Sequence, residues 1–330
     1  MNDRAVSALE AYDIEVQMTR KGRGTIICDT KEGSLVLVPY HGTEAKLLVE
    51  DKLLKKIAAD DVVKTDRLIQ NREGTFISKD MDGNRYILKS YHEGREADVK
   101  NRAECVEMME TLARLHTSMM LPAEELTGFA TYSPWKEYNK HNIELRRIFT
   151  YLKNKSQKGF FERRLYEVYR EYNEKAKEAA LGWHYYEEVL AKKDALEMRN
   201  ISHGDYQYHN VIKTQNGICV VHFEKWVVDT RVRDVYLMLR KLMEKNDWNL
   251  SFGKELLHAY QRILPLNAYD FIDLYYRLAY PEKFWKIANH YYNSPKAWIS
   301  GVSLEKLESV IRAEEQKARF LKDVFQGLTK

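Results

Sequence analysis

The chain has 330 residues, 44% of them hydrophobic, and is long enough to bury a large core in one big domain or in two lobes. Lysine and arginine (53 residues) nearly balance aspartate and glutamate (49 residues), and the formal net charge of +4 is too small to indicate a nucleic-acid-binding or membrane-surface protein. The three cysteines, Cys28, Cys105 and Cys219, lie far apart, which predicts synthesis in a reducing compartment without a disulfide framework.

Export and membrane insertion are not expected from the sequence. The first residues, Met-Asn-Asp-Arg-Ala-Val-Ser, contain no apolar run, so we expect no signal peptide and synthesis in the cytoplasm. No stretch of about 18 apolar residues occurs, which predicts that the chain does not insert into a bilayer. With its balanced charge the chain is also not expected to bind nucleic acid.

Residues 1–88 are predicted to form an N-lobe, a small antiparallel sheet with one helix packed on it. Runs of β-branched and apolar residues between turn residues predict strands at 14–18, 25–28, 34–38, 67–70, 75–78 and 84–88. Apolar residues at helical spacing predict a helix over 44–59. Between the first two strands, Gly22 and Gly24 fit either a glycine loop that covers a bound phosphate or a plain hairpin turn, and the hairpin is favoured.

Residues 89–98 connect the last of these strands to a helix. Gly94 permits a turn, and the acidic residues after it suit the start of a helix. In a two-lobed nucleotide-binding protein, such a connector is the hinge whose backbone meets the adenine edge. An ordinary strand-to-helix loop has the same pattern, so the residues alone leave both interpretations open.

Residues 99–330 are predicted to form a mainly helical C-lobe. A long amphipathic helix is expected over residues 160–193, with an interruption near Gly182 as an alternative. The many aromatic residues between 275 and 298 are expected to pack between helices. A partner-binding surface is the alternative interpretation of this aromatic segment.

The clearest chemical signal lies between His203 and Asn210. On a tight loop, Asp205 can accept the proton of an attacking hydroxyl group, and an Asn five residues later can hold a magnesium ion on nucleotide phosphates. Gly204 lets the backbone turn sharply beside this Asp. We interpret His203 and Asp234 as structural, and expect the Asp234 carboxylate to accept hydrogen bonds from this loop or to cap the helix that it opens. The spacing indicates a catalytic loop for phosphoryl transfer.

The strand after this loop, residues 218–223, departs from the pattern of a phosphoryl-transfer enzyme. A second metal-holding Asp is expected just before Phe223, and this position is His222. Neutral imidazole is a poor ligand for magnesium, which prefers hard oxygen donors. Glu224 lies on the same face as His222 if the strand continues, and would then offer a carboxylate.

Four stretches carry a family resemblance: residues 89–98, 112–116, 203–210 and 280–294. Through them the chain resembles the aminoglycoside phosphotransferase and choline kinase branch of the protein-kinase-like fold. Within that branch it is similar to the CotS-type spore-coat proteins of endospore-forming bacteria. The resemblance implies an α+β fold with two lobes, a sheet N-lobe over 1–88, a hinge over 89–98 and a helical C-lobe over 99–330. It also implies a place in the spore coat, with other coat proteins as partners.

The resemblance further implies roles for single residues. Asp205 takes the position of the catalytic base, and Asn210 takes that of a metal ligand. The hinge that contacts adenine consists of Lys89, Ser90 and Tyr91. ATP and magnesium are the cofactors of an active member of this branch, and a chain that uses neither is an equally open alternative.

A second departure concerns the lysine that binds phosphates in active kinases. The strand over residues 34–40 aligns with the strand that carries this lysine, and Val38 stands at its place. The helical glutamate that such a lysine orients, Glu44 or Glu50, is then expected to lack a lysine partner. Lys46 lies nearby in the sequence, but no pattern shows that it substitutes.

The two departures together weaken the case for catalysis. Losing one electrostatic stabiliser costs about 2.7–4 kcal/mol, so losing two removes roughly 5–8 kcal/mol, or about four to six orders of magnitude in rate. The sequence therefore favours a catalytically degenerate kinase-like protein that acts in spore-coat assembly by binding other proteins. Two alternatives stay open. One is an active phosphotransferase with a rearranged metal site, for which Asn210, His222 and Glu224 are the candidate ligands. The other is a non-catalytic nucleotide-binding switch.

Overall fold

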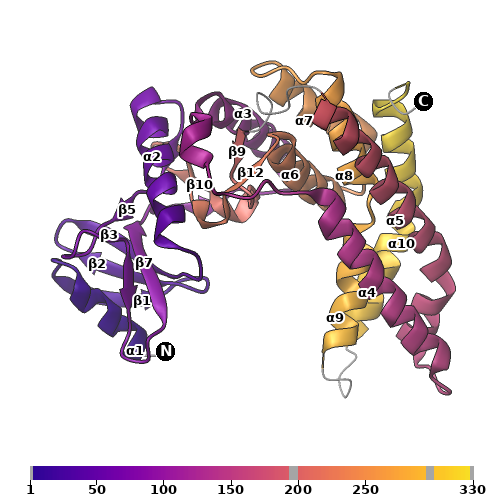
Figure 1. Ribbon diagram of the computed structural model, residues 1–330, viewed down its shortest axis with the longest axis horizontal. Coiled ribbons are helices and arrows are strands. Elements are labelled where there is room, and N and C mark those ends of the chain that lie inside the picture. Colours follow the sequence, from indigo (N-terminus) through magenta and orange to yellow (C-terminus); the bar gives the residue numbers. More distant parts are fainter. Residues whose placement is uncertain (1–2, 193–199, 295–300, 328–330) are drawn as a thin grey trace. The chain divides into compact units, whose positions relative to one another are not determined.

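The computed structural model describes residues 3–192, 200–294 and 301–327 (Figure 1). Its contacts divide the chain into two compact units. The sheet unit comprises Met1–Ala130 and Asn200–Val228, and the helical unit comprises Thr131–Arg199 and Asp229–Lys330. These units differ from the predicted lobes, because the segment from 99 to 130 and the loop around Asp205 group with the N-terminal sheet.

A six-stranded antiparallel sheet forms the first part of the sheet unit. Its strands follow the order β1-β2-β3-β7-β5, and β6 also pairs with β7. The strands are β1 (Val16–Lys21), β2 (Ile26–Thr30), β3 (Gly33–Pro39), β5 (Leu68–Ile69), β6 (Ile77–Lys79) and β7 (Arg85–Ser90). Each strand that the sequence predicts in this part is present, with bounds shifted by a few residues.

Alternating side chains bury both faces of this sheet. Val36 and Val38 of β3 pack with Leu47 of α2 (Glu44–Asp60) on one face. Leu37 of the same strand packs with Leu9 of η1 (Ser7–Ala11) on the other face. Successive residues of a strand point to opposite faces, so β3 is apolar where both faces are covered. Val38, at the expected lysine position, is therefore part of the core.

Helix α2 places a carboxylate inside the sheet unit. The helix begins after Thr43, whose side chain accepts a hydrogen bond from the Lys46 amide, and ends before Asp61 in a left-handed conformation (φ 50°). Glu50 lies three residues after Leu47 and is fully buried with it. Residues three or four apart share one helical face, so Glu50 points from α2 into the unit.

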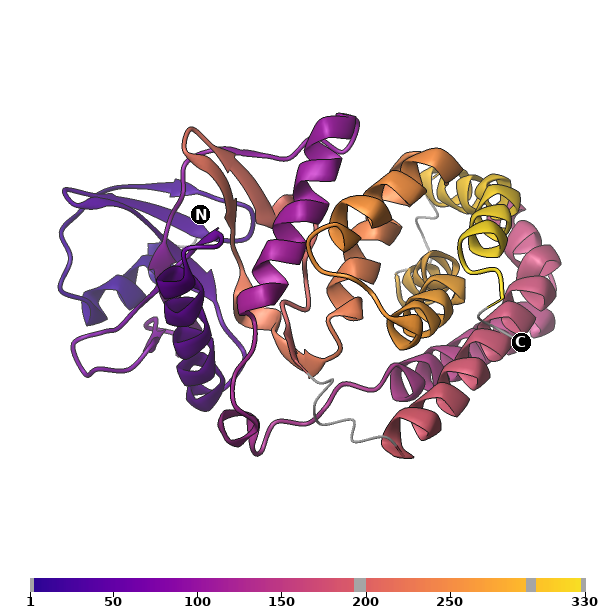
Figure 2. The same cartoon turned by 90° about the horizontal axis from the view of Figure 1, so that it is seen from above.

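A second sheet joins the loop around Asp205 to the N-terminal segment. Its order is β4-β11-β10-β8, and β4 runs parallel to β11. In Figure 2, β10 and β11 form the salmon hairpin. Its strands are β4 (Lys64–Thr65), β8 (Arg95–Glu96), β10 (Val211–Thr214) and β11 (Gly217–Val220). The remaining elements outside the two larger sheets and the long helices are α1 (Asp3–Val6), α3 (Arg102–Ser118), η2 (Ala123–Leu126), β9 (Asn200–Ser202), η3 (Tyr208–Asn210), η4 (Phe223–Lys225) and β12 (Val227–Asp229), which pairs with β9.

The helical unit contains long helices, as expected. They are α4 (Pro134–Asn154), α5 (Phe160–Lys192), α6 (Val232–Lys245), α7 (Leu250–Gln261), α8 (Ala268–Ala279), α9 (Glu282–Asn293) and α10 (Gly301–Val324). Helix α5 continues through Gly182 without interruption. A Cβ atom at Gly182 would lie 2.1 Å from the Tyr276 ring, so α5 and α8 pack so closely here that a larger residue would clash with Tyr276.

Aromatic side chains fill the core of the helical unit. Tyr138 stacks on Tyr280 with ring centroids 4.0 Å apart, and Tyr172 stacks on Phe284 at 4.3 Å. Tyr280, Phe284 and Tyr291 are all buried in this cluster. The interpretation of the aromatic segment as helix packing is confirmed for these residues, whereas Trp298 lies outside the described residues.

The structure places all three cysteines in its interior. Cys28, Cys105 and Cys219 are free and buried. Burial raises the pKa of the Cys28 thiol to about 11 and that of each of the other two to about 12, so the thiols remain protonated. Across residues 3–192, 200–294 and 301–327, no helix is both long and apolar enough to span a bilayer.

Candidate functional site

The loop around Asp205 is held by His203 and Asn210. The buried His203 ring accepts a hydrogen bond at Nδ1 from the Asp205 amide (3.2 Å), which leaves its Nε2–H to donate to the Val221 carbonyl (3.0 Å). The Asn210 side-chain amide donates to the Asp205 carbonyl (2.8 Å). His203 thus holds this loop against the end of β11, and Asn210 closes the loop on itself.

Gly204 allows the loop to approach the next turn closely. Its φ is +78°, a conformation that favours glycine, and a Cβ atom here would lie 2.1 Å from the Lys225 carbonyl oxygen. The backbone of η4 is therefore packed directly on the loop. This packing brings Lys225 beside Asp205.

Both oxygens of the Asp205 carboxylate already accept hydrogen bonds. Lys225 Nζ lies 2.8 Å from Oδ2, and Gln207 Nε2 lies 2.8 Å from Oδ1. The Asp205 side chain is 24% exposed, and that of Lys225 is 69% exposed. Each oxygen keeps a second acceptor site, so a hydroxyl group that approaches as a substrate would share this carboxylate with the two donors.

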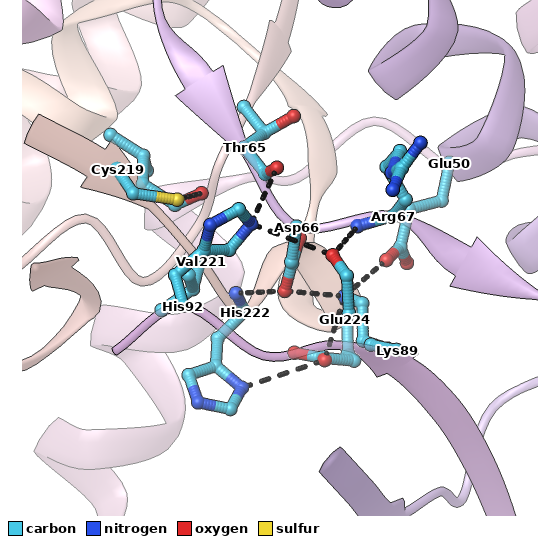
Figure 3. A network of polar contacts seen from close by, with 12 residues as sticks. Glu50, Thr65, Asp66, Arg67, Lys89, His92, Cys219, Val221, His222 and Glu224 are labelled. Carbon is cyan, nitrogen blue, oxygen red and sulfur yellow. Dashed lines mark hydrogen bonds and ion pairs between the residues drawn. The ribbon is translucent and has the colours of Figure 1, made fainter. Parts of the chain in front are cut away.

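A buried lysine, Lys89, lies at the centre of a second cluster (Figure 3). Its Nζ lies 2.8 Å from Glu50 Oε1, 3.1 Å from Asp66 Oδ2 and 2.9 Å from Glu224 Oε1. The lysine side chain is 0% exposed. Asp66 follows β4, Glu224 lies in η4 and Lys89 lies in β7, so α2 and three other parts of the chain meet here.

His222 is tied to the same cluster, which we call the lysine cluster (Glu50, Asp66, Lys89, His222 and Glu224). Its backbone amide donates to Asp66 Oδ2 (2.9 Å), and its Nδ1 lies 3.5 Å from Glu224 Oε1. The φ of His222 is 71°, a left-handed conformation that turns the chain sharply after β11. The turn directs the imidazole toward Glu224, as the close view shows (Figure 3).

The charges of the lysine cluster shift the pKa values of its members. Burial by itself would lower the pKa of Lys89, but Asp66, Glu224 and Glu50 raise it well above its ordinary value. Burial raises the pKa of Glu50 to about 7, against the opposing effect of Lys89. Burial likewise opposes ionisation of Glu224, yet Lys89 and His222 hold its pKa below the ordinary value.

The lysine cluster combines three carboxyl groups with Lys89 and with His222, whose pKa burial would lower but Glu224 and Asp66 raise. Three carboxylates face one ammonium group, and the buried atoms Glu50 Oε2 and Asp66 Oδ1 have no hydrogen-bond partner among the described residues. An isolated buried carboxylate is costly, and protonation is one way in which a protein reduces this cost. Glu50, with its raised pKa, takes up a proton as the pH falls through about 7.

A cavity of about 650 Å³ lies within the sheet unit, next to the lysine cluster. This volume is in the range of cofactor and substrate pockets. Its walls come from the β1–β2 hairpin, from β3, from the segment after β7, and from the loop and turn around Asp205. The residues that line it include Gly22, Arg23, Gly24, Val36, Val38, Ser90, Tyr91, Asp205, Asn210, His222, Glu224 and Lys225.

Most residues that the sequence singles out border this one cavity. Gly22 and Gly24 form a hairpin turn, with the Gly22 amide bonded to the Thr25 carbonyl (2.9 Å), and they also line the cavity. Ser90 and Tyr91 line it where a hinge is expected. Whether they contact adenine stays a prediction.

Three expectations need correction. Lys89 is not part of an exposed hinge, because its side chain is fully buried and its backbone pairs with Val36 and Leu68 on the two neighbouring strands. Glu50 does have a lysine partner, supplied by β7 rather than β3. The strand does not continue to Glu224, because it ends at Val220 and turns at His222.

Lys46 and Asp234 are not among the residues that line this cavity. Lys46 Nζ sits 5.3 Å above the Trp226 ring, a cation–π contact in the sheet unit. Asp234 is fully buried in the first turn of α6, in the helical unit. Its expected hydrogen bonds to the loop around Asp205 stay a prediction.

No local sequence pattern indicates Asp66 or Lys225, and the family resemblance places Lys89 in the hinge instead of the lysine cluster. One signal was present for Lys89, which follows the apolar residues Ile87 and Leu88 in a buried strand. A lysine in such a position is almost never fully buried without a charged partner. Its partners lie 39 and 135 residues away in the case of Glu50 and Glu224, and no local pattern identifies them.

Comparison with known proteins assigns the family. The family model described as "Spore coat putative kinase YutH" matches residues 7–324. The chain belongs to this family. The spore-coat family predicted from the sequence is therefore confirmed.

A curated relative supports this assignment. The spore coat protein S of Bacillus subtilis (strain 168) is 28% identical over 131 residues. The match covers 39% of this chain and 37% of that protein, so the chain spans little more than a third of the relative's length.

Solved structures show that this YutH-family chain has the predicted fold. An aminoglycoside phosphotransferase from Alicyclobacillus acidocaldarius superposes with a TM-score of 0.81 at 16% identity, covering 97% of this chain and 95% of the other. An amicoumacin kinase gives a TM-score of 0.62 at 11% identity, covering 97% and 94%. A choline kinase from Cryptosporidium parvum gives 0.50 at 13% identity, covering 98% and 96%. The aminoglycoside phosphotransferase-like kinase fold is confirmed, and at these identities the likeness shows the fold alone.

Proposed function

We propose that this YutH-family chain is a catalytically degenerate kinase-like protein of the spore coat, which acts in coat assembly by binding other coat proteins. One observation carries the proposal. The charged groups that an active kinase would use on a metal nucleotide are bound to one another in the sheet unit. Lys89 and Glu224 pair in the lysine cluster, and Asp205 pairs with Lys225.

The position of Lys89 is the first support. Phosphoryl transfer depends on cations that contact the phosphates and on a bound metal. Lys89 is sealed from the cavity, and to reach a phosphate it would have to leave three carboxylates at 2.8–3.1 Å. Breaking one buried ion pair costs about 3–5 kcal/mol, so this lysine stabilises the unit rather than the transferred group.

The metal ligands are the second support. His222 directs its imidazole to Glu224, and one Glu224 oxygen is shared between His222 and Lys89. Asn210 donates through Nδ2 to the Asp205 carbonyl, which leaves Asn210 Oδ1 as a single oxygen donor on the loop. In the part of the chain that the structure describes, no three His, Cys, Asp or Glu side chains are placed to hold one metal ion. Because Glu224 already pairs with Lys89 and His222, and imidazole is a poor magnesium ligand, the residues fit magnesium poorly, and we derive no step through it.

The binding role rests on the family. The matched family is a spore-coat family, and the curated relative is a spore coat protein. With transfer chemistry weakened, contact with other coat proteins is the action that remains for a coat component. We accordingly propose that the chain is made in the cytoplasm and becomes part of the spore coat.

Turnover of ATP tests the catalytic part of this proposal. Purified wild type and Asp205→Ala are incubated with magnesium and ATP, and ADP release is followed. We expect both to give the same background rate. Robust release by the wild type that disappears in Asp205→Ala would overturn the proposal.

Coat composition tests the binding part. Spores of a deletion strain are compared with spores that carry Asp205→Ala, and their extracted coat proteins are quantified. We expect the deletion strain to lose coat proteins that the Asp205→Ala strain retains. If the two strains show the same loss, the coat role depends on Asp205 chemistry and the proposal fails.

A second candidate function is an active phosphotransferase with a rearranged site. It is favoured by the presence of Asp205, Asn210 and Glu224 on the walls of one cavity. Under this alternative Asp205→Asn would lose measurable transfer, whereas unchanged activity in this variant would exclude it.

A further inference from the structure

We propose that a groove on the helical unit binds an acidic peptide segment of another coat protein, and that Arg146 and Arg147 of α4 contact its carboxylates. This inference rests on the proposed binding role in the coat, and it names the surface and the kind of partner. The groove lies wholly within the helical unit, on α4 and α9, which pack side by side (Figure 1).

The groove has a volume of about 750 Å³ and is open to solvent. The end of α4 and one tyrosine of α9 line it: Ile143, Arg146, Arg147, Thr150, Tyr151, Asn154, Lys155 and Tyr292. From Ile143 to Asn154 the lining residues recur at a spacing of three and four, so they share one helical face. This face runs for about 16 Å along α4, which is the length of about five residues of an extended peptide.

The groove carries positive charge without a counter-charge of its own. Three of its lining residues are cations, and no described residue of the lining is an acid. Lys155 pairs with Glu162, whose side chain is only 1% exposed. Arg146 and Arg147 are exposed, and neither forms an ion pair with any residue that the structure describes. Two guanidinium groups are therefore available to an acidic partner.

The local sequence of α4 does not explain these two arginines. An exposed cation on a helix gains from an acid three or four residues away, as Lys177 does from Glu174 in α5. At these distances from the two arginines the chain has one acid, Glu144, and its Oε2 accepts a hydrogen bond from Trp285 Nε1 (2.8 Å). The helix dipole favours cations in the last turn, but both arginines lie about two turns before the end of α4.

An acidic peptide suits both the charge and the shape of the groove. A guanidinium group binds a carboxylate through two parallel hydrogen bonds. Ile143, which is 40% exposed, offers an apolar contact beside the charges. The rings of Tyr151 and Tyr292 meet edge to face with centroids 5.7 Å apart and form a wall for a peptide side chain. A small anion would use the arginines alone, and the open groove would leave it mostly in water.

Nucleic acid suits the groove less well. A protein that binds DNA through its backbone commonly contacts about six to ten phosphates, whereas this groove offers two arginines without ion pairs among the described residues. The formal net charge of the chain, +4, adds little long-range attraction. We therefore expect the groove to prefer the carboxylates of a protein to the phosphates of a nucleic acid.

Fluorescence anisotropy with a labelled peptide tests this inference. The probe is Glu-Glu-Tyr-Glu-Glu with blocked ends, and Gln-Gln-Tyr-Gln-Gln is its uncharged counterpart. The full chain is compared with the groove variant, Arg146→Gln together with Arg147→Gln. The matched control, Arg312→Gln with Arg319→Gln, removes the same charge from exposed arginines of α10 outside the groove. We expect the acidic probe to bind the wild type and the control equally, and the groove variant about tenfold or more weakly.

Thr150→Glu provides a second variant, which keeps both arginines. The added carboxylate lies four residues after Arg146 and three after Arg147, which is close enough to pair with them. Because Thr150 is exposed, we expect the variant to fold like the wild type. Thr150→Glu should weaken binding of the acidic probe, whereas Thr150→Gln should bind it like the wild type.

Several results of these titrations would overturn the inference. They are equal affinity of the groove variant and the wild type, an equal loss in the α10 control, no binding of the acidic probe at millimolar concentration, and equal binding of the uncharged probe. A single-stranded oligonucleotide that binds the groove more tightly than the acidic probe would also overturn it, in favour of nucleic acid.

Spores distinguish failure of this inference from failure of the proposed function. Coat proteins are extracted from the deletion strain and from a strain that carries the groove variant. We expect both strains to lose the same coat proteins. If the deletion strain loses proteins that the groove variant retains, the groove inference fails and the proposed binding role stands. If the deletion strain loses none, the proposed function itself fails.

Discussion

Removing the charge of Lys89 should destabilise the sheet unit severely. Lys89→Met keeps the length of the side chain and removes the ammonium that faces carboxylates at 2.8, 2.9 and 3.1 Å. Lys89 is 0% exposed and Glu224, its most accessible partner, is 14% exposed, so solvent screening offers little relief. Removing one partner of a buried pair costs about 3–5 kcal/mol, a large part of the roughly 5–15 kcal/mol that stabilises a typical domain.

Glu50→Gln is the matched control for this prediction. It replaces one of the three carboxyl groups that face one ammonium, and burial raises the pKa of this carboxyl group to about 7, so it is only partly ionised at neutral pH. The amide oxygen can still accept the Lys89 hydrogen bond, so we expect a cost below about 1 kcal/mol. The asymmetry between the two variants distinguishes an acid-rich cluster from a balanced ion pair.

Hydrogen exchange is the appropriate assay, because a chain with two compact units need not unfold in one step. In Lys89→Met, amides of α2 and β7 should exchange about two to four orders of magnitude faster, whereas amides of α4 in the helical unit should be unaffected. Exchange in Lys89→Met equal to the wild type would refute this reasoning. So would a Glu50→Gln variant as unstable as Lys89→Met.

Three further predictions concern pH and two glycines. Burial raises the pKa of Glu50 from 4.5 to about 7 beside Lys89, so the stabilisation that its protonation gives the folded unit is complete below pH 4.5. Up to about 3 kcal/mol of this stability is lost as the pH rises through 7. Hydrogen exchange of α2 amides, corrected for intrinsic rates, should become faster over this pH range, and a flat wild-type profile would contradict the prediction. Gly204→Ala should cost about 1–3 kcal/mol of folding free energy, through its φ of +78° and the contact with Lys225, and so lower the melting temperature; an unchanged midpoint would argue against that packing. Gly182→Ala should destabilise α5 by about 1–3 kcal/mol in urea unfolding, because the added Cβ atom meets the Tyr276 ring. In a helix without such a contact, the same substitution stabilises by about 1 kcal/mol, so the sign of the change tests the contact.

The sequence was most informative where a pattern is local. Alternating apolar residues predict β3 and helical spacing predicts α2, because the periods of strands and helices differ. The spacing of Asp205 and Asn210 predicts a loop that the structure closes with a direct hydrogen bond. These features need only neighbouring residues, and so they can be inferred from one chain.

The sequence was least informative where charges meet over long separations. Lys89 faces Glu50 and Glu224 from 39 and 135 residues away, and the pairing depends on how α2 and η4 pack beside β7. The left-handed turn at His222 is equally hidden, because non-glycine residues adopt it seldom and without a strong sequence signal. The turn moves Glu224 from an expected strand into the lysine cluster, which changes its predicted role.

The discontinuity of the sheet unit has a consequence for synthesis on the ribosome. This unit contains Met1–Ala130 and Asn200–Val228, so its second sheet lacks β10 and β11 while the intervening residues are still being made. During that time Lys89 can find Glu50 and Asp66 but not Glu224. Domains generally fold as units and in chain order, but the sheet unit cannot complete its second sheet until β10 and β11 have been synthesised. Its final closure begins only when Val228 has left the exit tunnel, after more than two thirds of the 330-residue chain has been translated.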